Sequence, residues 1–307
     1  MSDHPPILII VINWQQPLIT VECINSLQRM DYPNKRFLLI DNGSEDNSSE
    51  YFQSTIPRIP LIAMPENLGF AKGANVGLRY ALQKGFEHAL LINNDAFPKK
   101  DMLTRLHREI RPDIALLSPK IYYKSEPDRI WFAGGERHPT LLEVRNRGQG
   151  EMDGPQWQTS RDVDYLLGTC LLVNLPLVAK LSFFDERYFM YYEDLDLSLR
   201  CQLAGLRLRL VSDAHLHHRV SVSSGGEDAP ARVYMIAKSS ILFFHTHASI
   251  GNRHAILVFR AFSAVKRLIS FLAIGNHKAA SAYLRGLLDG WHTVKSRQAH
   301  DHNAKSI

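Results

Sequence analysis

The chain has few cysteines, no long apolar run and no internal repeat, and each absence excludes a class of protein. Its three cysteines, Cys23, Cys170 and Cys201, are too few and too scattered for a disulfide framework or a thiolate zinc site. No uncharged apolar run approaches the roughly 20 residues that a membrane-spanning helix needs. The six apolar residues 7–12 follow two prolines and indicate a core strand, not a signal peptide. We therefore expect a reducing, cytoplasmic compartment.

The composition is that of an ordinary globular protein, but the charge is unevenly placed. Of 307 residues, 45% are hydrophobic and 22% charged, which excludes a disordered or fibrous chain. Nine Lys or Arg and two acids follow residue 250, leaving 27 of the 36 basic and 29 of the 31 acidic residues before it. The net charge of +5 therefore belongs to the tail. This favours a local anionic partner over a nucleic-acid-binding domain.

The first 120 residues alternate short apolar runs with longer amphipathic stretches, which predicts strand–helix units around a parallel sheet. The predicted strands are 7–12, 37–40, 61–63 and 89–92, and the predicted helices are 18–30 and 71–84. Asp41 and Asp95 follow two of these strands. Because ligands collect at the carboxyl ends of parallel strands, both residues are site candidates.

The later part of the chain is less regular before it becomes periodic again. Residues 120–165 have weak periodicity, and we expect an insertion over the site. Apolar order resumes over 165–173, and a helix is predicted over 195–204, ended by a glycine. A strand over 206–211 then leads to three histidines, His215, His217 and His218.

Carboxylates and histidines near these strand ends suggest chemistry, although each also has a structural interpretation. Asp95, after Asn93 and Asn94, could hold a divalent cation against phosphate oxygens, or could cap the following turn. The sequence Asp41-Asn42-Gly43-Ser44 is equally a generic turn.

Three acids in four residues, Glu193, Asp194 and Asp196, could raise one another's pKa and provide a general base. They could equally form the solvated first turn of a helix. His217 and His218 could include a metal ligand or be surface residues. A final group could offer hydroxyls and amides to a phosphate, or be a flexible loop: Ser221, Ser223, Ser224, Gly225 and Gly226.

The order of these segments resembles that of the family 2 glycosyltransferases with the GT-A fold, particularly the bacterial rhamnosyltransferase-like branch. Seven short segments between about residues 7 and 245 carry the resemblance: Ile12-Asn13-Trp14, Asp41-Asn42-Gly43-Ser44, Glu66-Asn67-Leu68-Gly69-Phe70-Ala71 with Gly73 and Asn75, Leu91-Ile92-Asn93-Asn94-Asp95, Gly168-Thr169-Cys170, Phe184-Asp185-Glu186 onward to Glu193-Asp194-Leu195-Asp196, and His218-Arg219-Val220-Ser221 to Gly226. The fold implied is α/β, a Rossmann-like, mostly parallel central sheet flanked by helices, with a C-terminal helical extension.

The resemblance implies roles for individual residues. Asp194, or less favourably Glu193, would be the catalytic base, and Asp95 and His218 would bind Mg²⁺ or Mn²⁺. The nucleotide-sugar residues implied are Asn13, Asp41, Asn42, Gly43, Asn67, Gly69, Gly73, Asn75, Asn94 and Lys238. Asn93 stands where the family has the first acid of its metal motif, and Lys238 stands where many relatives have Arg.

The implied reaction is a single displacement that inverts the sugar's anomeric centre. The donor would be a nucleoside-diphosphate sugar, with rhamnose the first expectation, and the acceptor a hydroxyl of a lipid-linked or polysaccharide glycan of a bacterial surface. Two alternatives are a nucleotidyltransferase, whose glycine-rich phosphate loop is missing near residue 12, and a non-catalytic sugar- or lipid-binding module, which would lack the acids.

We expect a catalytic domain over 1–250, a basic amphipathic helical extension over 251–295 and a disordered tail over 296–307. In the extension, apolar residues recur at three- and four-residue spacing, while Arg253, Arg260 and Arg267 recur every seven on another face. This pattern suits a helix on the anionic inner face of a membrane, or one packed on the protein or a partner.

Overall fold

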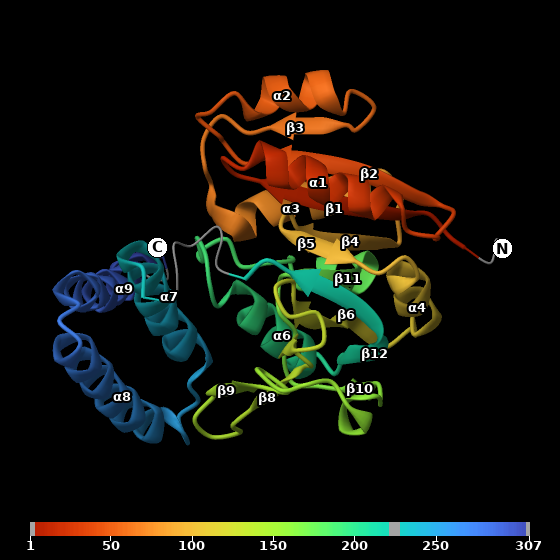
Figure 1. Ribbon diagram of the computed structural model, residues 1–307. Coiled ribbons are helices and arrows are strands. Elements are labelled where there is room, and N and C mark those ends of the chain that lie inside the picture. Colours follow the sequence, from red (N-terminus) through yellow and green to blue (C-terminus); the bar gives the residue numbers. More distant parts are fainter. Residues whose placement is uncertain (1–3, 221–227, 305–307) are drawn as a thin grey trace. The chain divides into compact units, whose positions relative to one another are not determined.

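The computed structural model describes residues 4–220 and 228–304, with side chains described up to Val294. The chain consists of two compact units, whose elements are drawn in Figure 1. The first contains Met1–Glu136, Arg145–Arg187 and Glu193–Val220, and the second Arg137–Val144, Tyr188–Tyr192 and Ser221–Ile307. The second unit thus begins before residue 251 and includes helix α7 (Pro230–His247), which the sequence analysis placed with the catalytic domain.

The amino-terminal part of the first unit has the predicted parallel strands. Its elements are β1 (Ile7–Asn13), α1 (Pro17–Gln28), β2 (Lys35–Asp41), α2 (Ser48–Thr55), β3 (Leu61–Ala63), α3 (Gly69–Gln83) and β4 (His88–Asn93). The strands lie in the order β4-β1-β2-β3, all parallel. All side chains from Ile7 to Val11 are buried, because helices flank the sheet (Figure 1).

The remaining part of the first unit adds antiparallel pairs, so the complete sheet is mixed. Its elements are β5 (Ala96–Pro98), α4 (Met102–Arg108), β6 (Ile114–Tyr123), β7 (Ile130–Phe132), β8 (Gly135–Arg137), β9 (Val144–Asn146), β10 (Arg161–Asp162), β11 (Cys170–Asn174), α5 (Leu175–Ala179), α6 (Glu193–Leu203) and β12 (Arg207–His218). Strand β11 runs antiparallel between β4 and β6, and β12 is parallel to β6.

Two predicted elements are longer in the structure. Strand β12 extends through His218 instead of ending near residue 211, because it pairs with β6 and β5 along its polar half. Helix α6 begins at Glu193, two residues before the predicted start. The expected insertion contains short strands, and it is tied to β6 by the fully buried Lys120, whose Nζ lies 2.9 Å from both Asp153 carboxylate oxygens.

The second unit consists mainly of α7, α8 (Arg253–Ala273) and α9 (His277–Ala304). Two glycines let α9 approach α7 closely: a Cβ on Gly286 would lie 2.4 Å from the Tyr234 carbonyl oxygen, and one on Gly290 2.7 Å from that of Lys238. Helix α9 continues through Ala304, into most of the segment expected to be disordered. No helix among the described residues is both long and apolar enough to cross a membrane.

Candidate active site

Asn13 and Asp41 join the carboxyl ends of β1 and β2. Asn13 Nδ2 donates to Asp41 Oδ1 at 2.9 Å, and Thr20 donates to Asn13 Oδ1 at 2.8 Å. The Asp41 carboxylate also accepts from the hydroxyls of Ser44, at 2.5 Å, and Ser49, at 2.7 Å. Both Asn13 and Asp41 are buried, so this network holds the strand ends and the Asp41–Ser44 turn in one arrangement.

Asn42 connects that turn to the start of α3. Its Nδ2 donates to Asn67 Oδ1 at 3.2 Å and to the Gly69 carbonyl at 3.1 Å, while its Oδ1 accepts from Leu68 N at 3.3 Å. A Cβ on Gly73 would lie 3.3 Å from the Asn42 amide, so α3 packs directly against it. The structure therefore brings the residues expected to shape a nucleotide pocket together at one edge of the sheet.

Gly43 is required in this turn for two reasons, and Gly85 provides a matched control. Both have positive φ, but a Cβ on Gly43 would lie 2.0 Å from the Glu66 carbonyl carbon, whereas nothing lies within 4 Å of one on Gly85. We expect Gly85→Ala to cost about 1 kcal/mol of unfolding free energy and Gly43→Ala about 3 kcal/mol or more. Thermal or denaturant unfolding of both variants measures this, and equal costs would contradict the crowding argument.

Asn75 was expected near the nucleotide, and it is fully buried with its amide directed at another segment. It donates to the Phe184 carbonyl at 2.9 Å and to Glu186 Oε1 at 3.0 Å, and its Oδ1 accepts from Phe184 N at 3.0 Å. Its side chain thus positions the segment that leads to Glu193 and Asp194. Asn94 likewise donates to Thr20 on α1, at 2.9 Å.

Asp95 and His218, 123 residues apart in sequence, meet at the ends of neighbouring strands. Asp95 Oδ1 lies 3.0 Å from His218 Nε2, and both side chains are buried. Their main chains are connected too, because Arg219 N donates to the Asp95 carbonyl at 3.0 Å. His218 Nδ1 is buried with no hydrogen-bond partner among the described residues, while Trp131 packs against the ring with centroids 4.6 Å apart.

The Asp95–His218 pair brings together two side chains that could ligate a metal ion. A carboxylate oxygen and an imidazole nitrogen are ligands for divalent metal ions, and the two facing atoms, Asp95 Oδ1 and His218 Nε2, lie 3.0 Å apart. Within the described ranges no group of three or more His, Cys, Asp or Glu could hold a metal. The remaining ligands would therefore come from donor phosphates and water, as is usual for Mg²⁺.

The other two histidines of β12 are directed away from Asp95. His215 and His217 both pack against Tyr122, with ring centroids 5.3 and 5.5 Å apart. His217 differs from His218 by one position and therefore lies on the opposite face of the strand. Of the three histidines, only His218 contacts Asp95 in the described part of the chain.

Asp194 occupies the first turn of α6, held by donors from a separate loop. Its Oδ2 accepts from Gly168 N at 2.9 Å and from the Tyr165 hydroxyl at 3.3 Å, and its Oδ1 accepts from Leu195 N at 2.8 Å. Burial raises the pKa of Asp194 above the ordinary value for an aspartate. A carboxylate that is oriented and has a raised pKa is suited to accept a proton.

The neighbouring acids differ from Asp194 in their surroundings. Glu193 is buried, and its Oε2 has no hydrogen-bond partner in the described part of the chain. Burial, followed by the charge of Asp194, raises the pKa of Glu193 well above its ordinary value. Asp196 is neutralised by Arg200, at 2.7 Å. Asp194 and Glu193 thus remain as the candidates for a base.

The sequence analysis did not single out two groups beside the Asp95–His218 pair. One is Trp131, on β7. The other is a cation pair: Lys124 Nζ lies 2.8 Å and Arg219 Nη2 2.9 Å from the Glu22 carboxylate. Lys124 follows β6 directly, and its amide donates to the His218 carbonyl at 2.9 Å. The sequence could have indicated this pair, because Lys124 and Arg219 each follow directly after a strand.

Two expected contributions lie in the second unit or outside the described residues. Lys238 lies on α7, in the second unit. The serine- and glycine-rich segment from Ser221 to Gly226 lies outside the described residues.

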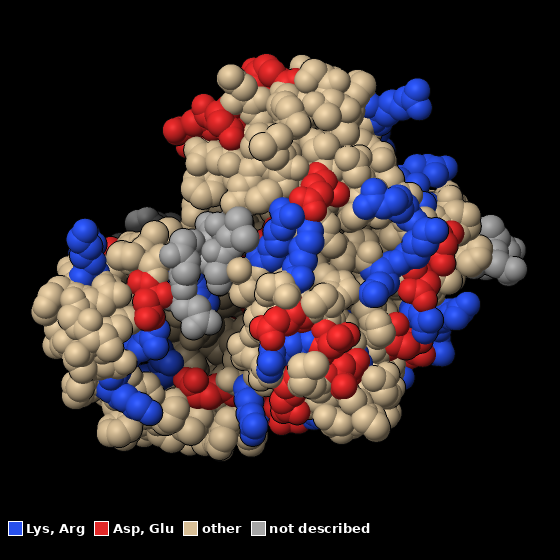
Figure 2. Space-filling model, in the orientation of Figure 1, with Lys and Arg blue, Asp and Glu red and all other residues tan. Residues whose placement is uncertain are grey.

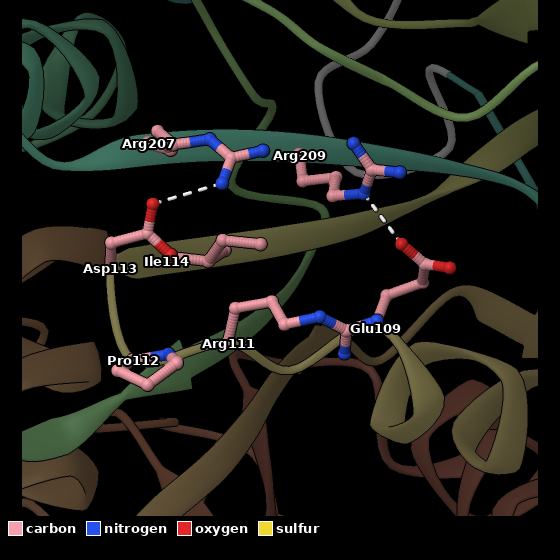
Figure 3. Close-up of a pocket in the computed structure, with 7 residues that line it drawn as sticks. All are labelled: Glu109, Arg111, Pro112, Asp113, Ile114, Arg207 and Arg209. Carbon is pink, nitrogen blue, oxygen red and sulfur yellow. Dashed lines mark hydrogen bonds and ion pairs between the residues drawn. The ribbon is translucent and has the colours of Figure 1, made fainter.

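A pocket of about 270 Å³ lies at the amino ends of β6 and β12, the opposite end of β12 from His218 (Figure 3). Its lining includes Arg207, 2.9 Å from Asp113, and Arg209, 2.6 Å from Glu109. Acidic and basic side chains lie interspersed in patches on the visible face, most of which is uncharged (Figure 2). Because these arginines already have acidic partners, we assign this pocket no part in the candidate site.

Two models of known protein families together match most of the chain. The model described as Glycosyl transferase family 2 matches residues 8–166, and the one described as Glycosyl transferase family group 2 matches residues 88–269. The two matches together include Asp41, Asp95, Asp194 and His218.

Two of the curated relatives that this chain resembles have names that mention rhamnose. An N-acetylglucosaminyl-diphospho-decaprenol L-rhamnosyltransferase of Mycobacterium tuberculosis (strain CDC 1551 / Oshkosh) is 28% identical over 247 residues, 71% of this chain and 75% of the relative. The dTDP-rhamnosyl transferase RfbF of Shigella flexneri is 21% identical over 204 residues, 64% of this chain and 66% of the relative.

Among solved structures, GalNAc-T7 with UDP, GalNAc and Mn²⁺ superposes with a TM-score of 0.59 at 11% identity. The match covers 78% of this chain and 48% of that one, and at this identity it shows a shared fold. The fold is therefore GT-A, as the resemblance implied.

Proposed function

The chain belongs to glycosyl transferase family 2, and on that premise we propose that it is an inverting, metal-dependent transferase of bacterial surface-glycan synthesis. The donor would be a nucleoside-diphosphate sugar, first of all dTDP-rhamnose, and the acceptor a hydroxyl of a lipid-linked or polysaccharide glycan. The names of the two rhamnosyltransferase relatives support these choices. The observation that carries the proposal is the buried contact of Asp95 with His218, in a unit that also orients Asp194.

We propose that Asp95 and His218 hold Mg²⁺ or Mn²⁺ against the donor diphosphate. Such an ion would supply positive charge to stabilise the departing nucleoside diphosphate. The turn built on Asn13, Asp41 and Asn42 would bind the nucleotide, with Gly43, Asn67, Gly69 and Gly73 giving it its shape. Asn75 and Asn94 would act indirectly, because their amides hold neighbouring segments of the site.

Asp194 would accept the proton of the acceptor hydroxyl as that oxygen attacks the anomeric carbon. The donors from Gly168 and Leu195 orient the carboxylate, and its raised pKa makes it a stronger base than an exposed aspartate. Only one base and one displacement are needed, so the product would have inverted configuration. The nucleotidyltransferase and the non-catalytic module, the two alternatives from the sequence, gain no support from the family match.

A thermal-shift panel tests the donor proposal. We expect dTDP-rhamnose with Mn²⁺ to raise the melting temperature, since a ligand at 100 times its Kd stabilises the folded state by about 2.7 kcal/mol. A UDP-hexose should raise it less. The controls are each donor with excess chelator, and dTMP and rhamnose added separately. If no nucleotide sugar changes the melting temperature in the presence of Mn²⁺, the proposal is wrong.

A further inference from the structure

Helix α8 exposes an apolar face. Five side chains at alternating spacings of four and three residues lie on one side of it, each 53–72% exposed: Val258, Phe262, Val265, Ile269 and Leu272. The only fully buried apolar side chains of α8 among the described residues are Ile256 and Phe271. A row of large exposed apolar side chains on a single helix face is a mark of an interaction surface.

Two of the arginines expected to face a membrane form ion pairs within the second unit. Arg260 lies 3.0 Å from Glu143, and Arg267 lies 2.9 Å from Asp228. Both guanidinium groups also lie over aromatic rings, those of Phe244 and Phe271. These two arginines therefore have partners within their own unit, so a salt-sensitive membrane attachment would depend on the other basic residues of the tail.

The surroundings of the apolar face indicate which partner would cover it. Residues 251–288 include no Asp or Glu. Lys266 is exposed on α8 beside the apolar face, four residues after Phe262, and Lys278 and Arg285 are exposed on α9. A second copy docked face to face would bring like charges together. An anionic surface would instead complement them, and only a lipid surface combines negative charge with an apolar interior.

We propose that α8 lies in the plane of an anionic bilayer with this face, Val258 to Leu272, inserted among the acyl chains. Lys266, at the edge of this face, would contact the headgroups, and the apolar side chains would supply most of the affinity. The biological sense of this arrangement rests on the proposed function, because a lipid-linked acceptor is reached from the membrane surface. The binding itself requires neither donor nor acceptor.

Cosedimentation of the full chain with vesicles tests the proposal. We expect binding to phosphatidylglycerol vesicles that is only partly lost in 0.5 M NaCl, because salt screens charge but not apolar insertion. The variant Phe262→Ser/Ile269→Ser should bind about tenfold or more weakly. Both side chains are exposed, so the melting temperature should stay unchanged. Leu203→Ser, at a 74% exposed position of α6, is the matched control and should bind like the unchanged chain.

Three outcomes would overturn the inference. One is no binding to either phosphatidylglycerol or phosphatidylcholine vesicles. Another is vesicle binding that is lost completely in 0.5 M NaCl and is unaffected by Phe262→Ser/Ile269→Ser. That result would mean that charge alone holds the chain on the vesicle. The third is a stable dimer that this variant dissociates, which would make a second copy the occupant. Because no sugar donor is present, failure here leaves the thermal-shift result for the proposed transferase untouched.

Discussion

The Asp194→Asn enzyme is expected to turn over about 10²–10⁴ times more slowly, because general-base catalysis typically contributes that much. Donor affinity should be nearly unchanged, since the acids of α6 are proposed to act on the acceptor. The new amide cannot accept from both Gly168 N and Leu195 N, so we also expect a loss of about 1–3 kcal/mol of stability. Turnover at saturating donor must therefore be measured well below the melting temperature, beside a donor titration.

Glu193→Gln is the matched control for that experiment. It should reduce turnover less than Asp194→Asn, and it should change the dependence of stability on pH. The pKa of Glu193 is higher in the folded state than in the unfolded chain, so its protonated form favours folding. That contribution is fully present below the unfolded pKa and is lost as pH rises through the folded pKa. Relative to the unchanged chain, the variant should gain stability as pH rises through that window.

The pH profile of kcat/KM gives a further readout of the base. The rate should rise with pH through an apparent pKa above that of an ordinary aspartate, and the value belongs to the Glu193–Asp194 pair because the two groups interact. Asp194→Asn should remove this limb. A fully active Asp194→Asn enzyme would show that Asp194 is not the base. Loss of donor binding together with turnover would mean that Asp194 binds the nucleotide or the metal instead.

His218→Gln is expected to weaken Mn²⁺-dependent donor binding by about 100-fold, because removing even an outer partner of a metal typically costs 10–100-fold. The imidazole is one of two protein groups that would hold the ion. His217→Gln is the matched control, because it changes the adjacent residue on the opposite face of the strand, where the ring stacks on Tyr122. Donor titrations with Mn²⁺ and with chelator should separate the two variants.

Asp95→Asn should behave like His218→Gln in the same titrations, because the two contacting side chains are proposed to hold the same ion. In the presence of chelator, the two variants and the unchanged chain should bind the donor equally weakly. Equal donor affinity of the unchanged chain with Mn²⁺ and with chelator would remove the metal from the mechanism. Equal losses in His217→Gln and His218→Gln would mean that the strand was disturbed instead of a ligand.

The amino-terminal strands could be predicted from sequence because their apolar runs end sharply in polar residues. Residues 7–12 and 89–92 read as buried strands and lie within β1 and β4. The carboxyl end of β12 could not be predicted in the same way. Ser212, Asp213 and His215 interrupt its apolar pattern, and the strand continues only because β6 and β5 pair with it.

Contacts that depend on pairing between strands far apart in the sequence could not be predicted either. Trp131 lies beside His218 because β7 pairs with β6, and no local pattern marks that relation. The seven-residue spacing predicts that Arg260 and Arg267 share one face of a helix. It does not predict that Glu143 and Asp228 lie against that face. Periodicity predicts which side chains share a face, while tertiary structure decides what the face contacts.

The long separation between Asp95 and His218 has a consequence for biosynthesis. The chain emerges from the ribosome amino end first, so β1, β2 and β4 can pair long before β12 exists. The contact between Asp95 and His218 forms only when β12 adds beside β6, 123 residues after Asp95. A nascent chain would therefore have most of the proposed nucleotide-binding turn while still lacking His218, the second proposed metal ligand. If those roles hold, metal-dependent donor capture begins only near the completion of the sheet.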